Sequence, residues 1–367
     1  MTERLFLSGN EAVVYGALDA GCRFYAGYPI TPSSEIMHLM AKELPRVGGV
    51  FIQAEDELAA INMIIGASWA GLKSMTATSG PGFSLMQEGI GYAVMTETPL
   101  VIVDVMRAGP ATGQATKSAQ GDLMQARWGR HGDQYLVVIA PMTPQEAYDL
   151  VIEAFNIAEA YRVPTVFLMD EFIGHGREIV VRRDADKLVE RRRPSDHEPP
   201  FGSKDPRIPP PMPRLGEGYY VLVTGSTHNE WGYRDVHGFE THYKLVTRLK
   251  EKIWGNIDKI FKYKVYGDPD ARRTIVCFGS TCRPAMDAAK RVGGTKVLRL
   301  ITLWPLDYGK LAEELSDAEK VVVPELNLGQ LVYDVAQVYP RNKIRVVNKV
   351  GGGIPIYPSE IIKALEA

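Results

Sequence analysis

The feature of this sequence that most constrains its fold is a repeated alternation between strand-length apolar runs and helical segments with an apolar stripe. In the first half, strands are predicted at 23–26, 50–52, 74–78, 100–104 and 165–169, and helices at 10–20, 33–44, 56–70 and 83–95. A further helix is predicted to begin at Pro144 and to end before Pro164. Short connections between each strand and the next helix favour a mostly parallel sheet with helices on both faces. The predicted fold class is therefore α/β.

The second half of the chain repeats this pattern. Strands are predicted at 274–278, 297–300, 320–323 and 344–347, with helices between them. Before them lies a less regular region, 225–270, which contains one helix near 240–253. We predict two open, mostly parallel, doubly wound domains, the second with an insertion at its start.

Proline marks the expected boundary between the two domains. Of the 24 prolines, eight lie between 194 and 213. Proline lacks a backbone donor and restricts φ, so this stretch is predicted to be an extended linker without regular structure. The predicted division is a first domain at 1–185, a linker at 186–215, and a second domain at 216–367 with its insertion at 225–270.

Charge and cysteine content exclude several functions. The 42 Lys+Arg and 44 Asp+Glu give a net charge of −2, so neither nucleic acid nor a membrane surface is an expected partner. The three cysteines have no C-x-x-C spacing, which argues against a zinc or iron–sulfur site; we expect no metal in this chain, and buried thiols at Cys277 and Cys282. Without a membrane-length apolar run or a signal-type start, a cytoplasmic location is expected.

The candidate site follows from where ligands bind in open α/β sheets, which is beyond the carboxyl ends of the strands. In the first half, polar and glycine-rich residues follow four predicted strands. These are Tyr28, Pro29 and Thr31 after the first, Glu55, Asp56 and Glu57 after the second, Ser79, Gly80, Pro81 and Gly82 after the third, and Arg107 after the fourth. This edge offers a cation for an anionic ligand and carboxylates for proton chemistry.

Each of these residues also has a structural interpretation. Thr31 before a proline is typical of a helix N-cap, and the three acidic residues suit the start of a helix. The Gly-Pro-Gly run could be a tight turn, and Arg107 could form a structural ion pair. Their convergence on one sheet edge is what favours the functional interpretation.

Several common sites are missing from the sequence. It contains no G-x-x-x-x-G-K-[ST] phosphate loop and no G-x-G-x-x-G after a strand. Ser79 does not fit a nucleophile elbow, because Ala77 stands where that motif needs glycine. ATPase, dinucleotide and serine-hydrolase functions therefore lack their signals.

Six motifs together resemble the alpha subunit of 2-oxoacid:ferredoxin oxidoreductases. They are YPITPS at 28–33, QAEDE at 53–57, TATSGPGF at 76–83, QGDLMQAR at 120–127, TLWP at 302–305 and ELNLGQ at 325–330. The resemblance covers nearly the whole chain. It is strongest to the 2-oxoglutarate enzyme, with the branched-chain 2-oxoacid (2-oxoisovalerate) enzyme next.

The resemblance implies oxidative decarboxylation of 2-oxoglutarate to succinyl-CoA, with thiamine diphosphate as cofactor and ferredoxin as electron acceptor. It also implies a pyrimidine-type thiamine-binding domain followed by a transketolase C-terminal-like domain. The G-D-G signature of the magnesium site is absent; Gly121-Asp122 and Gly267-Asp268, for example, are followed by Leu123 and Pro269. The chain is thus expected to carry half of the thiamine site.

The resemblance also implies roles for particular residues. Glu55 matches the carboxylate that binds the pyrimidine nitrogen and favours the imino tautomer, while Asp56 and Glu57 fall outside that position. Thr31 and Arg107 match the residues that hold the 2-oxoacid carboxylate, and Thr116 is expected to shape the substrate pocket. Tyr28, Pro29, Ser79 and Gly80 are expected to line the pyrimidine ring.

By the same resemblance, a beta subunit would supply the diphosphate site, Mg2+ and a [4Fe-4S] cluster. A separate gamma subunit handling coenzyme A and a ferredoxin-like delta subunit are further expected partners. Two other classes stay open on the sequence: a non-catalytic organising subunit, and a free-standing α/β protein that binds an anion.

Overall fold

The computed structural model describes residues 2–183, 187–195 and 197–367. Its first sheet has eight strands, most of them parallel. In spatial order they are β13 (Thr302–Trp304), β7 (Val137–Ile139), β8 (Pro164–Asp170), β5 (Leu100–Ala108), β4 (Lys73–Thr78), β2 (Cys22–Gly27) and β3 (Val50–Gln53), with β6 (Gln114–Ser118) paired to β5 off this path. β13 and β6 are the antiparallel members.

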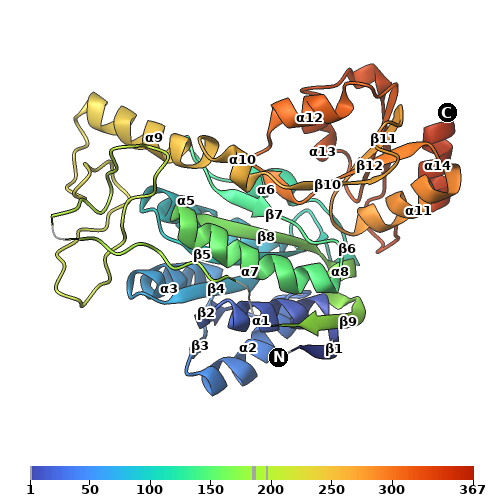
Figure 1. Cartoon of the computed structure of the whole chain (residues 1–367). Coiled ribbons are helices and arrows are strands. Elements are labelled where there is room, and N and C mark those ends of the chain that lie inside the picture. The colour runs from blue at the N-terminus through green and yellow to red at the C-terminus, as the bar shows by residue number, and fades with distance from the viewer. Residues whose placement is uncertain (1, 184–186, 196) are drawn as a thin grey trace.

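Helices cover both faces of the first sheet, as right-handed crossovers require when the strand order reverses direction (Figure 1). One face carries α1 (Gly9–Asp19), α2 (Ser34–Glu43) with the 3-10 turn η1 (Leu44–Val47), α7 (Pro144–Tyr161) and α8 (Glu171–His175). The other carries α3 (Glu57–Trp69), α4 (Gly80–Leu85), α5 (Gln87–Met95) and α6 (Leu123–Trp128). β1 (Glu3–Ser8) and β9 (Arg177–Arg182) form a separate antiparallel pair beside α1 and α7.

The second sheet has five strands, of which only β10 is antiparallel to its neighbour. In spatial order they are β10 (Tyr263–Gly267), β12 (Thr295–Leu300), β11 (Arg273–Cys277), β14 (Lys320–Glu325) and β15 (Ile344–Asn348). Its helical segments are η2 (Gly279–Thr281), α11 (Cys282–Val292), α12 (Tyr308–Leu315), α13 (Leu331–Val335), η3 (Arg341–Lys343) and α14 (Pro358–Glu366). The predicted class of two open, mostly parallel α/β sheets is confirmed.

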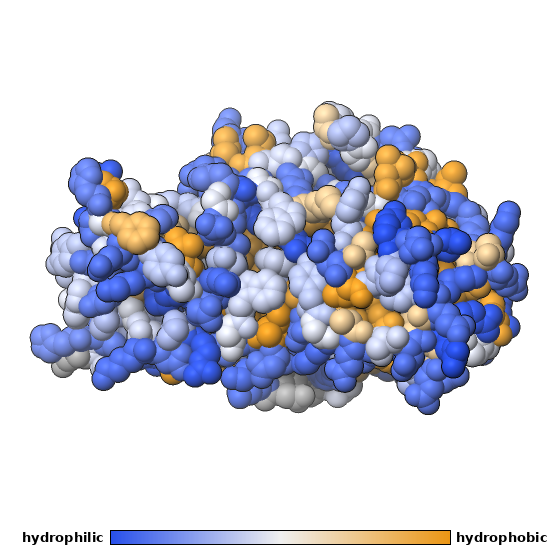
Figure 2. Space-filling view, turned by 90° about the horizontal axis from the view of Figure 1, so that it is seen from above, coloured by the Kyte–Doolittle hydropathy of each residue, from blue (hydrophilic) through white to orange (hydrophobic). Residues whose placement is uncertain are grey.

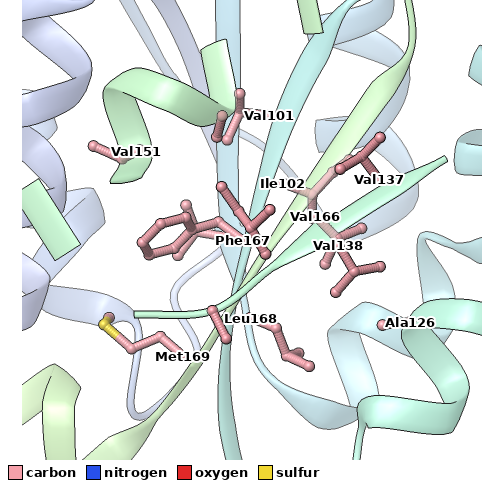
Figure 3. Packing of buried hydrophobic residues seen from close by; sticks show 14 of the residues in the cluster. Val101, Ile102, Ala126, Val137, Val138, Val151, Val166, Phe167, Leu168 and Met169 are labelled. Carbon is pink, nitrogen blue, oxygen red and sulfur yellow. The ribbon is translucent and has the colours of Figure 1, made fainter. Parts of the chain in front are cut away.

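The core of the first sheet is built from the central strands. Fully buried side chains of β5 and β8, such as Val101 and Phe167, lie toward Val151 of α7, while Ile102 points to the opposite face of the sheet (Figure 3). Strands with both faces covered need continuous apolar runs, which is what the sequence provides at 100–103 and 166–169.

The proline-rich stretch has no helix or strand in its described residues, as the prolines predict. It is nevertheless packed against the first sheet. Fully buried Arg162 donates to the carbonyl groups of Pro200 and Pro211 at 2.6 and 2.8 Å, and buried Arg191 pairs with Glu159 at 2.6 Å. Arg191 belongs to a charged run at 182–193 that would be expected to form a solvated linker face, and its burial contradicts that expectation. The predicted boundary at 185–186 lies outside the described residues.

The second half of the chain begins with the helices α9 (Phe239–Trp254) and α10 (Ile257–Ile260), within the predicted insertion. Seen from above, the face that carries α9 and the second sheet is largely hydrophilic, with apolar side chains in several separate groups (Figure 2). None of the described helices has the length and apolar character needed to cross a membrane.

Two features of the second half differ from expectation. β13 leaves its own half and extends the first sheet at β7. Cys277 and Cys282 form a disulfide instead of remaining thiols, because the turn η2 between β11 and α11 brings their Cα atoms to 5.3 Å.

Candidate functional site at the carboxyl edge of the first sheet

The candidate site is built from the segments that follow β2, β3 and β4 and from the carboxyl end of β5, which lie at the same edge of the first sheet. Arg107 was expected after the fourth strand but lies within β5, which extends to Ala108. The structure brings Thr31 and Arg107 together: Arg107 Nη1 donates to the Thr31 carbonyl oxygen at 2.8 Å. Thr31 is not a helix N-cap, since α2 begins at Ser34 with Ser33 as its cap. The structural interpretation of Thr31 therefore fails.

Arg107 is a buried cation without a carboxylate partner. Its side chain is 6% exposed, and within the described chain it forms no ion pair inside 4 Å. Its Nε atom has no hydrogen-bond partner among the described residues. A buried guanidinium with unused donors is suited to binding an anion, because leaving such donors unpaired is costly.

The three consecutive acidic residues after β3 have different environments. Asp56 caps α3, with its carboxylate accepting from the Ala59 backbone N–H at 2.7 Å, while Glu55 is exposed. Glu57 is 4% exposed, and burial raises the pKa of its carboxyl group. The charge of Arg107 acts weakly against this rise in the pKa of Glu57.

Glu57 and Thr78 border a space that only glycine leaves open. A Cβ atom on Gly82 would clash with Glu57 Oε1 and with Thr78 Oγ1. The residues 80–82 form the first turn of α4 instead of a tight turn, and Ser79 precedes it without making a side-chain cap. The Oγ atoms of Thr78 and Ser79 are buried and have no partner within the described structure.

Orphaned polar atoms thus cluster at this edge: Thr78 Oγ1, Ser79 Oγ and Arg107 Nε, beside the Glu57 carboxyl group. Buried polar groups are normally hydrogen-bonded, so such a cluster marks a place where a polar ligand completes the bonding. A ring nitrogen and an amino group of a heterocycle, together with a carboxylate, would fit these donors and acceptors.

The remaining predicted residues lie nearer the surface. Tyr28 is 40% exposed, and Pro29 beside it is exposed too. Gly80 has φ of +34° and lies next to the Arg107 side chain. Thr116 is exposed on β6 and is not part of the cleft described next.

An interdomain cleft of about 450 Å³ opens beside Arg107 and Gly80. Its walls come from the first domain and from the segment after β14. The second-domain residues lining it are Leu326, Asn327, Leu328, Gln330 and Val350. No group of three or more potential metal-binding side chains was found among the described residues.

Sequence reasoning placed Glu57 at this edge but gave it no role, and it did not single out Asp104 or Asp122 as site residues. Asp104 is fully buried on β5, and Asp122 precedes α6. The signal that was available for Asp104 is its position inside an otherwise apolar buried strand, LVIVDVM at 100–106, where an unpaired charge is costly.

Two family descriptions match the chain. Residues 15–248 match "Pyruvate flavodoxin/ferredoxin oxidoreductase, thiamine diP-bdg", and residues 271–361 match "Pyruvate:ferredoxin oxidoreductase core domain II". The first match covers more than half of the chain. The chain therefore belongs to the pyruvate flavodoxin/ferredoxin oxidoreductase family, and its first domain is of the thiamine-diphosphate-binding type.

Within this family the chain is similar to subunits of 2-oxoglutarate enzymes. It is 50% identical to 2-oxoglutarate synthase subunit KorA of Methanocaldococcus jannaschii, over 98% of each chain. It is 36% identical to ketoisovalerate oxidoreductase subunit VorB of Methanothermobacter thermautotrophicus, over 95% of this chain and 93% of that one. The recognition of an alpha-type subunit of 2-oxoacid:ferredoxin oxidoreductases is confirmed.

Solved structures agree with the fold. A 2-oxoglutarate:ferredoxin oxidoreductase from Magnetococcus marinus, with 2-oxoglutarate, coenzyme A and succinyl-CoA bound, superimposes with a TM-score of 0.93 at 31% identity. The match covers 99% of this chain and 65% of that one. A split-gene transketolase matches with a TM-score of 0.58 at 16% identity over 98% of this chain and 97% of that one, which shows a shared fold alone.

Proposed function

We propose that the chain is the alpha subunit of a CoA-acylating 2-oxoglutarate:ferredoxin oxidoreductase. The reaction is the oxidative decarboxylation of 2-oxoglutarate to succinyl-CoA, with electrons passed to ferredoxin. The observation that carries the proposal is the end-to-end identity of 50% to a 2-oxoglutarate synthase subunit, on a chain whose buried Arg107 lies unpaired at the ligand-binding edge.

Thiamine diphosphate, when bound, supplies the nucleophile for the 2-oxo carbon and the electron sink for decarboxylation. Its aminopyrimidine ring fits the cluster of orphaned atoms, since Glu57 and the hydroxyl groups of Thr78 and Ser79 offer hydrogen-bonding partners at the edge of β4. Tyr28, Pro29 and Gly80 would border the ring from the ends of β2 and β4.

The resemblance assigns the carboxylate that binds the pyrimidine nitrogen to Glu55, but the geometry favours Glu57. A carboxyl group exchanges a proton with a ring nitrogen best in a poorly hydrated site, where the contact is strong. Glu57 is buried and has a raised pKa, whereas Glu55 is exposed. We therefore propose Glu57 for this role. Glu55 lies at the exposed border of the site, and its substitution is the matched control.

Arg107 is the residue that we propose to bind the 2-oxoacid carboxylate. The hydrogen bond to the Thr31 carbonyl orients its guanidinium and leaves the other N–H groups for the substrate. Holding the carboxylate in this way fixes the 2-oxo carbon for attack. The Thr31 hydroxyl would assist from the segment between β2 and α2, and Thr116 would contribute to specificity from β6.

We propose that the rest of the cofactor site belongs to other subunits. The relatives are named as subunits, which supports a multi-subunit enzyme. A beta subunit would bind the diphosphate, Mg2+ and a [4Fe-4S] cluster. A separate gamma subunit and a ferredoxin-like delta subunit would complete the complex.

The first test is the substrate preference of the complex, purified with its natural partner subunits. Reduction of ferredoxin is measured with 2-oxoglutarate, 2-oxoisovalerate and pyruvate in the presence of coenzyme A. The highest kcat/KM is expected for 2-oxoglutarate. A preference for 2-oxoisovalerate would move the chain to the branched-chain enzymes, and full activity of the isolated chain would contradict the shared cofactor site.

The second test compares Glu57→Gln with Glu55→Gln. Loss of a proton-handling carboxyl group typically lowers kcat by about 10²–10⁴-fold, and this loss is expected for Glu57→Gln. Glu55→Gln is expected to stay near wild type. The reverse result would return the role to Glu55, and full activity of both variants would support the organising-subunit alternative.

A further inference from the structure

Asp104 is a buried carboxyl group that has no role in the proposed reaction. It lies on the central strand β5, three residues before Arg107, and its side chain is fully buried. Within the described residues neither of its oxygens receives an ordinary N–H or O–H donor. A buried carboxylate without a hydrogen-bond donor is costly, so another group nearby must stabilise it.

The neighbour of Asp104 is a second carboxyl group, that of Asp122. The two side chains lie within hydrogen-bonding reach of each other, and Oδ2 of Asp122 also lacks a described donor. Two carboxylates cannot hydrogen-bond to each other unless a proton lies between them. Arg107 is the cation that acts on both carboxyl groups. The Gly80 backbone N–H approaches Asp104 without completing a hydrogen bond of ordinary geometry.

The environment favours retention of that proton. Burial, with the adjacent charge of Asp122 adding to it, raises the pKa of Asp104 well above its ordinary value. Burial likewise raises the pKa of Asp122 to about 6. Near neutral pH the pair therefore carries about one negative charge, and it forms no ion pair with Arg107 within 4 Å among the described residues.

Asp122 stands at the end of a segment that is bound tightly to the second domain. The backbone N–H of Gln120 donates to the Leu326 carbonyl at 2.9 Å, and Asn327 Nδ2 donates to the Gln120 carbonyl at 2.7 Å. Gln330 Nε2 donates to the Gly121 carbonyl at 2.6 Å. The second domain therefore positions the two residues that precede Asp122.

We propose that Asp104 and Asp122 share one proton, and that this carboxyl pair is the positioning element that holds Arg107 and the Ser79–Gly80 segment in register with the second domain. Four segments meet at the pair: β5, the start of α4, the 120–122 segment and, through Gln120, the residues after β14. The inference rests on the proposed function, because it concerns the residue assigned to the 2-oxoacid carboxylate.

Loss of the shared proton would place two negative charges beside Arg107. One carboxylate would then compete with the substrate for the guanidinium, and mutual repulsion would loosen the 120–122 segment. The charged groups facing the pair are Arg107 and, through its interaction with Arg107, Glu57. Affinity for the 2-oxoacid should therefore fall as pH rises.

The test uses Asp104→Asn in the complete complex, because asparagine has the same shape and a permanent donor where the proton lies. For wild type, KM for the 2-oxoacid is expected to rise by up to about tenfold per pH unit once the pair loses its proton. For Asp104→Asn, KM should stay flat over the same range. Asp104→Leu, which cannot hydrogen-bond, should raise KM at every pH, and Asp317→Asn at an exposed position is the control.

Two results would overturn the proposal: an Asp104→Asn variant with the pH profile of wild type, or an Asp104→Leu variant with wild-type KM throughout. A second measurement does not depend on turnover. A carboxyl pKa raised in the folded state means that stability is lost as pH rises from about 4. The Tm of wild type should therefore fall relative to that of Asp104→Asn over this range. Parallel curves of Tm against pH for the two proteins would contradict a proton shared by Asp104 and Asp122.

These readouts keep the two proposals apart. A complex that oxidises no 2-oxoacid contradicts the proposed function, while the Tm comparison still decides whether the proton is shared. A complex that is active but shows a flat KM in wild type contradicts the carboxyl pair alone.

Discussion

The two edges of the first sheet differ in whether their buried charges are paired. At the amino edge, fully buried Glu97 accepts from Arg248 at 2.5 and 2.9 Å and from Lys252 at 2.7 Å, and Arg162 donates to its backbone carbonyl. At the carboxyl edge, Arg107 lies almost as deeply buried without such a partner.

The paired charges around Glu97 stabilise the fold, whereas the unpaired charge of Arg107 is available to bind a ligand. A satisfied network costs little beyond desolvation and positions the segments that it joins, here α9 and the start of β5. An unsatisfied buried group is costly and persists where binding completes its bonds. The contrast predicts that substitutions at the amino edge change stability, and that substitutions at the carboxyl edge change substrate or cofactor affinity.

The largest effect is expected for Glu97→Gln. It leaves Arg248 and Lys252 without their counter-charge, which typically costs about 3–5 kcal/mol of unfolding free energy. Burial alone would raise the pKa of Glu97, but Arg248 and Lys252 hold it well below the ordinary range. The stabilisation is therefore present above about pH 4.5 and is lost as pH falls, so the gap between variant and wild type should narrow in acid.

Urea unfolding of the purified complex at several pH values measures this gap. A variant with wild-type stability and a raised KM would reverse the assignment of the two edges.

The next effect is expected for Arg107→Ala. A hydrogen-bonded charge pair with the substrate contributes about 1.5–3 kcal/mol, so KM for the 2-oxoacid should rise by about 10–100-fold. Thiamine diphosphate binding and the unfolding midpoint should stay near wild type. Steady-state kinetics and calorimetric titration with the cofactor check these outcomes, and an unchanged KM would remove Arg107 from the site.

A smaller effect is expected for Gly82→Ala. The added methyl group would press on Glu57 and Thr78 and narrow the space proposed for the pyrimidine ring, at a cost of about 1–2 kcal/mol in cofactor affinity. Gly91→Ala is the matched control, since a Cβ atom there meets no described atom within 4 Å inside α5. That control should gain about 0.5–1 kcal/mol of stability and leave cofactor affinity unchanged.

The smallest effect is expected for Arg272→Ala. Arg272 pairs with Glu319 at 2.5 Å, but both side chains are more than half exposed. Water and salt screen such a pair, so neither the unfolding midpoint nor the kinetics should change measurably. A clear loss of stability would show that ion-pair distance, and not burial, decides which charges matter in this chain.

Much of the fold follows from local patterns. The predicted strands and helices of both halves appear within a few residues of their expected bounds, because an apolar run and a helical stripe are each properties of one short segment. β13 could not be predicted in this way. Its three residues pair with β7, about 160 residues earlier in the chain, and no local signal specifies that partner.

The site was predictable to the level of segments but not of atoms. The residues after β2, β4 and β5 were expected, since the sheet edge collects them. Which of Glu55, Asp56 and Glu57 points inward depends on where α3 begins, and with Asp56 as its cap the first helical residue is the buried one. The Asp104–Asp122 contact depends on the path of β6 and α6, which the sequence pattern does not define.

β13 has a consequence for the way this chain could be divided. A fragment ending in the proline-rich stretch would leave β7 as an open sheet edge with unpaired N–H and C=O groups, a known cause of aggregation. The fragment that follows would carry the missing strand with nothing to pair against. When the two halves are co-expressed, they should therefore assemble by pairing β13 with β7, whereas either half expressed alone should be insoluble.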